Sequence, residues 1–192
     1  MTISGEVRAP RLTKEGRREQ LLDAAAAIVV ELGCDALTME RLGERAGVSK
    51  ALPYSHFDNA DDVLVALYFR FVGALGARVI DTVEHAAPGD DLAAAVVNSY
   101  FDAVFDLGPA LAAVSAPGSR ASELADASDS VGPDFVTDLL VDHFAVARSR
   151  ARAAAPVLLS ALVGAASAWG AGRGSRADLE VISVAVLRAC VG

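Results

Sequence analysis

The sequence predicts an all-α fold of two helical domains. Apolar residues recur at intervals of three and four along the 192-residue chain, and no segment alternates apolar and polar residues as a half-buried strand does. Gly and Pro residues separate these periodic runs, as they do between helices. Hydrophobic residues make up 53% of the chain, which is enough to form a buried core.

The first sixty residues are expected to form three short helices. These span residues 14–32, 39–46 and 49–57. Gly33 ends the first helix, as a Gly at the C′ position does, and Thr38 and Ser49 are residues that cap helix N-termini. Gly47 allows a tight turn, and Val48 fixes that turn to the core. Two short helices joined by such a turn form a helix-turn-helix, whose second helix enters the major groove of DNA.

Longer helices are expected in the rest of the chain. Asn59 caps a helix that continues to Pro88, with Asp61 and Asp62 in its first turn, where the helix dipole favours anions. Further helices are expected at residues 90–106, 110–114, 134–153, 156–171 and 176–191, with a long connection at 115–133. The predicted domains are residues 1–60 and residues 61–192.

The net charge of −8 is unevenly distributed. Residues 1–60 hold 8 Lys or Arg and 9 Asp or Glu, a net of −1, whereas residues 61–192 hold 9 and 16, a net of −7. Arg8, Arg11 and Lys14 make the N-terminal arm mildly basic, and this arm is either a DNA contact or a solvated tail. The pattern suits a small DNA-binding end on an acidic body.

The segment from Arg18 to Tyr68 resembles the DNA-binding domain of the TetR family of bacterial regulators. The family's motifs stand here, in order, as Leu22-Asp23-Ala24-Ala25, Gly33, Leu37-Thr38-Met39, Leu42 to Lys50, Tyr54-Ser55-His56-Phe57 and Asp61-Asp62-Val63-Leu64. The resemblance implies a homodimeric transcription regulator that is not an enzyme and binds a double-stranded DNA operator through residues 1–60. It also implies effector binding and dimerisation by residues 61–192, with a small molecule releasing a repressor from DNA.

The resemblance further implies which residues contact DNA. Thr38, Tyr54 and His56 would hold phosphates, whereas Lys50, Ala51 and Leu52 would face base edges. The full expected set is Thr38, Arg41, Ser49, Lys50, Ala51, Leu52, Tyr54, Ser55 and His56. Their chemistry agrees with these roles, because Lys can reach guanine or phosphate, and Tyr and His can donate to phosphate oxygens.

Two residues depart from the family pattern. Ala60 stands where a lysine is usual, which removes a phosphate contact, and Pro53 stands where an aliphatic residue is usual. Pro53 has no N–H to donate to the carbonyl of Ser49, so the first turn of the recognition helix should be distorted. These departures leave an alternative open, a helical dimer that binds a ligand or partner and has a weakened DNA-binding motif.

The C-terminal helices are expected to enclose an effector pocket and to form the dimer interface. The expected pocket residues are Phe71, Tyr100, Phe101, Phe105, His143 and Trp169. They predict a mostly apolar ligand that Tyr100 or His143 holds by one or two hydrogen bonds. The expected four-helix interface consists of Leu158, Leu162, Ala165, Ala168, Leu179, Ile182 and Val186. The alternative for each set is a place in the core of one chain.

No pattern in the sequence indicates a metal, a cofactor or a catalytic centre. His85 and His143 have no Cys, His or paired carboxylate at ligand spacing, and no nucleophile motif is present. Cys34 and Cys190 are expected to be free thiols. The N-terminus has no apolar signal core, so we expect a cytoplasmic protein without a membrane-spanning segment.

Overall fold

The computed structural model describes residues 12–89, 91–116, 118–126 and 131–192. Arg8 and Arg11 of the N-terminal arm lie outside the described residues. The described part contains helices and no strand, so the all-α prediction is confirmed. Its α-helices are α1 (Lys14–Leu32), α2 (Met39–Arg45), α3 (Ala60–Glu84), α4 (Leu92–Ser115), α5 (Arg120–Asp126), α6 (Val131–Phe144), α7 (Arg148–Gly170) and α8 (Arg176–Val191). Two 3-10 helices are η1 (Cys34–Ala36) and η2 (Pro53–Ser55).

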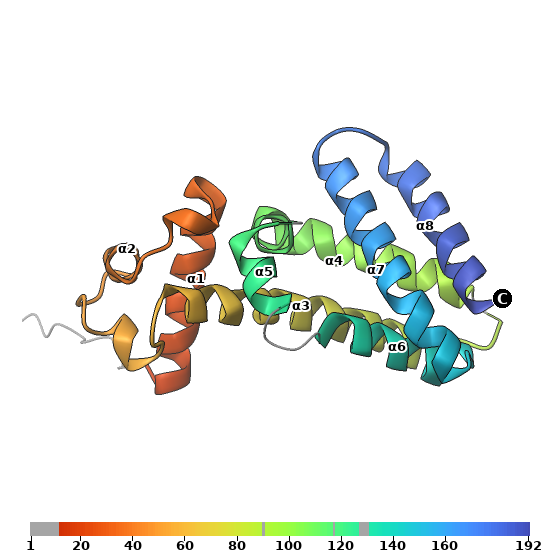
Figure 1. Ribbon diagram of the computed structural model, residues 1–192, viewed down its shortest axis with the longest axis horizontal. Coiled ribbons are helices and arrows are strands. Elements are labelled where there is room, and N and C mark those ends of the chain that lie inside the picture. The colour runs from red at the N-terminus through yellow and green to blue at the C-terminus, as the bar shows by residue number, and fades with distance from the viewer. Residues whose placement is uncertain (1–11, 90, 117, 127–130) are drawn as a thin grey trace, which may run out of the picture.

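The helices form an elongated molecule with the helix-turn-helix segment at one end (Figure 1). The long helices α3 and α4 run from this end to the opposite end, where α6, α7 and α8 pack on them (Figure 1). The short helix α5 covers α3 close to the point where α1 crosses it (Figure 1). The two ends of the molecule are therefore linked by continuous helices.

Two hydrophobic cores lie along this axis, and α3 and α4 contribute to both. The N-terminal core includes Leu21, Leu22, Ala25, Ile28, Leu42, Phe57, Leu64, Leu67, Leu111, Val114 and Ala121. The C-terminal core includes Val79, Val83, Val97, Tyr100, Phe101, Leu139, Leu140, Ala151, Ala155, Leu158, Leu162 and Leu187. The N-terminal core thus holds residues from both sides of the boundary that the sequence analysis draws between residues 60 and 61.

The helix α4 is kinked at Gly108, where the sequence predicts a helix to end. Gly108 has φ 64° and ψ −155°, which is a conformation available essentially only to glycine. Pro109 follows and has no backbone N–H, so it cannot continue the preceding hydrogen-bond pattern. The kink separates the part of α4 in the C-terminal core from residues 110–115, which pack in the N-terminal core.

Replacing Gly108 by Ala is expected to lower the free energy of unfolding by about 1–3 kcal/mol, because a Cβ disfavours this backbone conformation. Gly73 is the matched control, since it lies in the interior of α3 with no atom within 4 Å of an added Cβ. Gly73→Ala should raise the free energy of unfolding by about 0.5–1 kcal/mol. Urea unfolding of both variants measures the difference, and equal effects would contradict the assignment of strain to Gly108.

The boundary between α6 and α7 differs from the sequence prediction, which placed a helix at 134–153 and another at 156–171. In the structure the break lies at residues 145–147, and Pro156 is inside α7. Ala145 adopts φ 54°, and the N–H of Val146 donates to the carbonyl of Leu140 at 3.1 Å. Val146 is buried, so its packing supports a conformation that Ala rarely adopts.

A helix also replaces part of the connection expected at residues 115–133. The hydroxyl of Ser119 accepts from the N–H of Ser122 at 3.1 Å and so caps the start of α5. Arg120 pairs with Asp61 of α3, and Ala121 is fully buried in the N-terminal core. These contacts hold α5 against α3.

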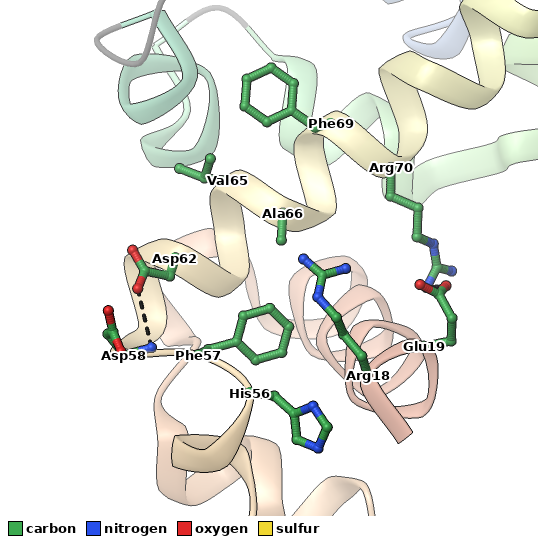
Figure 2. A pocket seen from close by; sticks show the side chains of 10 residues that line it. All are labelled: Arg18, Glu19, His56, Phe57, Asp58, Asp62, Val65, Ala66, Phe69 and Arg70. Carbon is green, nitrogen blue, oxygen red and sulfur yellow. Dashed lines mark hydrogen bonds and ion pairs between the residues drawn. The ribbon is translucent and has the colours of Figure 1, made fainter. Parts of the chain in front are cut away.

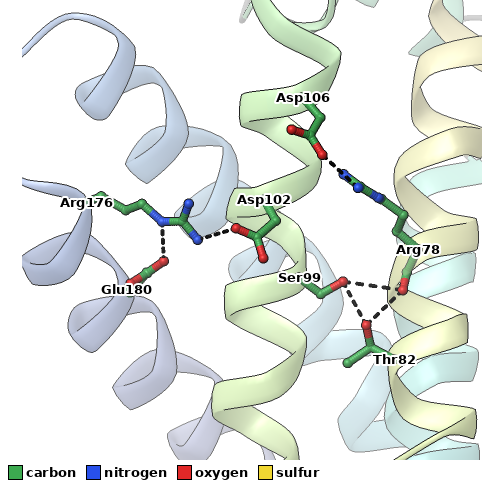
Figure 3. A network of polar contacts seen from close by, with 7 residues as sticks. All are labelled: Arg78, Thr82, Ser99, Asp102, Asp106, Arg176 and Glu180. Carbon is green, nitrogen blue, oxygen red and sulfur yellow. Dashed lines mark hydrogen bonds and ion pairs between the residues drawn. The ribbon is translucent and has the colours of Figure 1, made fainter.

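Ion pairs connect α4 to the helices on either side of it (Figure 3). Arg78 of α3 contacts Asp106 at 2.7 Å, and Arg176 of α8 contacts Asp102 at 2.6 Å. The hydroxyl of Thr82 donates to Ser99 at 2.8 Å. All of these contacts lie before the kink at Gly108, so this part of α4 is fixed between α3 and α8.

Two helices of the described chain, α3 and α7, are long and apolar enough to cross a membrane by length and composition alone, a test that the core helices of soluble proteins also pass. In the structure α3 lies against α4 and belongs to both cores. The helix α7 packs against α6 and α8 with Leu158 and Leu162 inward. Packing within a helical protein therefore accounts for much of this apolar character, and one face of α7 stays exposed.

Candidate nucleic-acid interface and cavity

The turn after α2 brings the following segment close to that helix. Thr38 caps α2, since its hydroxyl oxygen accepts from the N–H of Arg41 at 3.2 Å. Gly47 has φ 67°, and the N–H of Val48 donates to the carbonyl of Gly43 at 3.0 Å. A Cβ on Gly43 would lie 3.5 Å from the Cα of Lys50, at van der Waals contact. The recognition segment, residues 49–57, therefore lies directly on α2.

The recognition segment is less regular than the helix predicted at 49–57. Residues 50–52 form turns, and only Pro53–Ser55 form a 3-10 helix. Because Pro53 has no N–H, the bond to the carbonyl of Ser49 comes from Leu52 instead, at 3.0 Å. The expected distortion is confirmed, but the prediction of a helix from residue 49 is wrong.

The structure leaves most of the predicted DNA-contacting residues exposed. The exposed members are Thr38, Arg41, Ser49, Lys50, Ala51, Tyr54 and Ser55, whereas Leu52 and His56 are half-buried. Tyr54 is 60% exposed, although it belongs to a segment that packs on the core through Pro53 and Phe57. Ser55 already donates to the carbonyl of Leu52 at 2.7 Å. Tyr54 therefore offers a freer hydroxyl than Ser55.

All three cationic side chains between residues 38 and 57 have partners within the chain. Lys50 pairs with Glu40, Arg45 donates to Glu31 at 2.7 Å, and Arg41 donates to the carbonyl of Ala36. The partnership raises the pKa of Lys50 and lowers the pKa of Glu40, chiefly through their hydrogen bond. A phosphate or a base that binds Lys50 would therefore compete with Glu40.

A first cavity of about 670 Å³ lies beside the recognition segment, between α1, residues 56–58 and the start of α3 (Figure 2). The guanidinium of Arg18 lies 5.1 Å from the ring centre of Phe57, and the N–H of Asp58 donates to Asp62 at 3.2 Å. The Nδ1 atom of His56 is buried and has no hydrogen-bond partner among the described residues. This open cavity has acidic and basic walls, and Arg18 packs on Phe57 at its edge.

A second cavity, of about 560 Å³, lies among α3, α4 and α7. Three predicted pocket residues line it, namely Tyr100, Phe105 and Trp169. The other three lie elsewhere. Phe71 is buried in the N-terminal core, Phe101 is buried behind Trp169 at a ring-centre distance of 5.9 Å, and His143 lies in the last turn of α6 without lining the cavity.

The sequence analysis missed several residues that line this second cavity. They are Tyr68, Val72 and Leu75 of α3, Val104, Gly108, Pro109, Leu111 and Ser115 of α4, and Leu159, Val163, Ala166 and Ser167 of α7. The Gly108-Pro109 pair was visible in the sequence as a break, but a break does not show which cavity it borders. The sequence does not distinguish an aliphatic residue that lines a cavity from one that is buried in the core.

The predicted interface residues also divide into two groups. Leu158 and Leu162 are buried in the C-terminal core of the single chain, and Leu179 and Val186 pack against that core. Ile182 is 58% exposed, and so are two apolar residues outside the predicted set, Val181 of α8 at 70% and Val157 of α7 at 58%. The apolar surface that one chain leaves uncovered therefore includes Ile182 of the predicted stripe and residues beside the stripe.

No group of three or more His, Cys, Asp or Glu side chains is placed to hold a metal ion within the described residues. Cys34 is buried and Cys190 is half-buried, and both are free thiols. Burial raises the pKa of the Cys34 thiol above its ordinary value, which disfavours the thiolate.

Sequence comparison agrees with the geometry of the helix-turn-helix. The profile of the family described as "Bacterial regulatory proteins, tetR family" matches residues 21–67, which run from α1 through the recognition segment into α3. Residues 21–67 of this chain are therefore a TetR-family DNA-binding domain. The match includes the exposed recognition segment and the part of the N-terminal core that α1, α2 and the start of α3 contribute.

Individual relatives extend the comparison. This chain is 34% identical over 98 residues to the HTH-type transcriptional activator FasR of Mycolicibacterium smegmatis, which covers 51% of this chain and 45% of FasR. The chain thus matches less than half the length of this curated relative. A TetR-family transcriptional regulator from Streptomyces coelicolor is similar in structure, with a TM-score of 0.70, 21% identity and coverage of 92% of this chain and 98% of that chain.

A transcriptional regulator FadR from Bacillus subtilis, solved in complex with stearoyl-CoA, has a TM-score of 0.67 and 18% identity to this protein. The similarity covers 91% of this chain and 97% of that chain. At these identities the two solved structures show a shared fold, including the helices that surround the second cavity.

Proposed function

We propose that this protein is a cytoplasmic, homodimeric transcription regulator whose affinity for operator DNA is changed by a small molecule in the second cavity. The observation that carries the proposal is the exposed recognition segment, with Lys50, Ala51 and Tyr54 presented beside the capped helix α2. Cation, small residue and hydroxyl are the side chains that reach base edges and phosphates. FasR, the relative that is 34% identical over 98 residues, is named a transcriptional activator.

The second cavity supports the effector part of the proposal. It is lined by residues on both sides of the kink at Gly108, and α4 continues from it into the N-terminal core. A ligand that fits only one arrangement of α4 would shift the population of that arrangement. The related fold of FadR, which was solved in complex with stearoyl-CoA, supports the binding of a small molecule by a protein of this fold.

The exposed faces of α7 and α8 support the homodimer. On α7 the uncovered residues Ala153, Val157, Ser160 and Gly164 follow helical spacing, and on α8 they are Val181, Ile182, Ala185 and Ala189. An exposed apolar patch of this kind is typical of a protein–protein interface. We therefore place the interface on these residues, with Ile182 retained from the sequence prediction.

A gel-shift assay on DNA from the upstream region of the gene tests the function. Wild-type protein should bind one sequence in preference to others, with affinity that falls as salt rises. Tyr54→Phe and His56→Ala should weaken binding to all sequences, whereas Lys50→Ala should also reduce the preference between sequences by about 1–3 kcal/mol. Binding by all three variants that equals wild type would contradict the assignment of the recognition segment.

The paired cations and Pro53 favour a second candidate function, a helical dimer that binds a ligand without binding DNA tightly. Under this candidate no operator is selected from random duplexes, whereas ligand binding to the cavity persists.

A reporter gene placed behind a selected operator decides the direction of regulation by the proposed DNA-binding protein. Repression that the effector relieves is the expected result, and activation by the protein would instead match the name of FasR.

Replacing Glu40 by Gln is expected to strengthen DNA binding at low salt by about threefold to tenfold. The change frees Lys50 and removes a negative charge beside the expected path of the phosphates. Glu31→Gln is the matched control, because it makes the same charge change but releases Arg45 instead. Titration of labelled operator measures both affinities, and equal gains would show that only net charge matters.

A further inference from the structure

The described residues that line the second cavity carry no charge. None of these described residues is Asp, Glu, Lys, Arg or His. Aromatic and aliphatic side chains form most of the surface, and the polar side chains among the described lining residues are Tyr68, Tyr100, Ser115 and Ser167. A charged group placed there would lose its hydration without gaining an opposite charge from these walls, which is strongly unfavourable.

Tyr100 is the polar group best placed to orient a ligand. It is only 6% exposed, it lines the cavity, and no hydrogen bond of its hydroxyl is found among the described residues. In contrast, the hydroxyl of Ser115 already donates to the carbonyl of Leu111. The hydroxyl of a buried tyrosine usually has a hydrogen-bond partner, and a ligand in the cavity supplies one.

The protonation state of Tyr100 suits this role. Desolvation raises the pKa of its phenol well above the ordinary value, so the hydroxyl stays neutral at physiological pH. A neutral phenol can both donate and accept one hydrogen bond, and it does not attract a cation as a phenolate would.

We propose that the second cavity binds an uncharged lipophilic molecule, or the uncharged part of a larger ligand, with one polar group hydrogen-bonded to the hydroxyl of Tyr100. This inference rests on the proposed function for the biological role of the ligand, but its binding chemistry can be tested without DNA. The sequence predicts only a mostly apolar ligand. The inference adds that ionised groups are excluded from the cavity and that Tyr100 selects the polar group of the ligand.

Trp169 gives a direct signal for occupancy of the cavity. It is the single Trp of the chain and lines the cavity, stacked on Phe105 at a ring-centre distance of 6.0 Å. Its fluorescence in the full-length protein should change when a probe enters. The probes form two matched series, one on an eight-carbon alkyl chain and one on a biphenyl ring pair. Each series consists of an alcohol or phenol, a carboxylate, an ammonium ion and the plain hydrocarbon.

The alcohol and phenol probes, octanol and para-phenylphenol, are expected to bind most tightly of their series. The carboxylate and ammonium probes should bind at least about tenfold more weakly than the hydroxyl probe on the same scaffold. Tighter binding of either charged probe than of the hydroxyl probe, or no binding of any probe from the two series, would overturn the proposal.

Octanoyl-CoA distinguishes the two sources of the ligand. If octanoyl-CoA binds at least as tightly as octanol and its affinity depends on Tyr100 in the same way, the cavity holds the uncharged part of a larger ligand. If octanoyl-CoA binds more weakly than octanol, the ligand is a free lipophilic molecule.

Tyr100→Phe tests the hydrogen bond, since it removes one oxygen and keeps the ring. The affinity for octanol and para-phenylphenol should fall about tenfold, while the affinity for the hydrocarbons stays unchanged or rises. Tyr54→Phe is the matched control, because it makes the same change at an exposed tyrosine that does not line the cavity, and it should alter neither affinity. Equal losses for hydroxyl and hydrocarbon probes would show that Tyr100 only shapes the cavity, and would overturn its assigned role.

The experiment separates this inference from the proposed function. Probe binding with the expected selectivity, but without any effect on a DNA complex, would contradict the effector role and leave the ligand chemistry standing. Release of DNA by a charged molecule that does not change Trp169 fluorescence would retain regulation by a ligand but contradict the assignment of this cavity.

Discussion

Val181→Glu is expected to dissociate the dimer and to remove tight operator binding. Val181 is the most exposed large apolar residue of the described chain, at 70%, and it lies on the face of α8 where we place the interface. A symmetric dimer would bury two new carboxylates, one from each subunit. Each unpaired buried charge makes the free energy of association less favourable by several kcal/mol. The dimer dissociation constant should therefore rise by at least about 100-fold.

Sedimentation velocity and operator titration measure the two effects of Val181→Glu. A monomer can contact only one half-site at a time, so its operator affinity should fall by roughly 100-fold or more. Ala77→Glu is the matched control, because it adds the same charge at an exposed position of α3, which is not part of the proposed interface. An unchanged dimer of Val181→Glu would move the interface to another surface.

Phe101→Ala is expected to lower the free energy of unfolding by about 3–5 kcal/mol. The ring is fully buried in the C-terminal core and lies 5.7 Å from Tyr100 and 5.9 Å from Trp169, centre to centre. Its removal leaves a cavity that these neighbours can fill only in part. Urea unfolding at a fixed protein concentration measures the loss, since dimerisation would otherwise change the apparent stability.

Phe105→Ala is the control for this prediction. Phe105 also stacks on Trp169, but it is 66% exposed. The loss of stability should stay below about 1 kcal/mol, because little of its apolar surface leaves water on folding. Similar losses for both variants would show that contact with Trp169, rather than burial, determines the stability of this region.

The end of α1 and the starts of α2 and α3 could be predicted closely because local residues determine them. Thr38 and Asn59 cap α2 and α3 as expected, with side-chain oxygens that accept backbone N–H groups. Gly33 and Gly47 have positive φ at the expected turns. Capping and glycine turns depend on neighbours within a few positions, so the sequence alone carries enough information.

The helix boundaries that failed depend on tertiary packing. Ala145 has no local reason to adopt positive φ, and the break there follows from the buried Val146 and its bond to Leu140. Pro156 was read as the start of a helix, but α7 continues through it. A kink-prone residue inside a long helix looks the same in sequence as one at its first turn.

The candidate sites show the same division. Tyr100, Phe105 and Trp169 line one cavity, but the sequence did not separate them from Phe101, which is buried. On α7 it selected Leu158 and Leu162 for the interface, although their face is covered by the same chain. A helical stripe indicates that a face is apolar, and only the arrangement of neighbouring helices decides what covers it.

The passage of α4 across its kink into the N-terminal core has a consequence for the construction of chimeric regulators. The helix-turn-helix of this protein rests on Leu111, Val114 and Ala121 as well as on its own helices. Transplanting residues 1–60 alone onto another protein would leave this core without Leu64 and Leu67 of α3 and without its residues from α4 and α5. A functional exchange of DNA specificity should therefore carry the first half of α3 and residues 110–121 with it, or else substitute only the exposed side chains from Ser49 to Ser55.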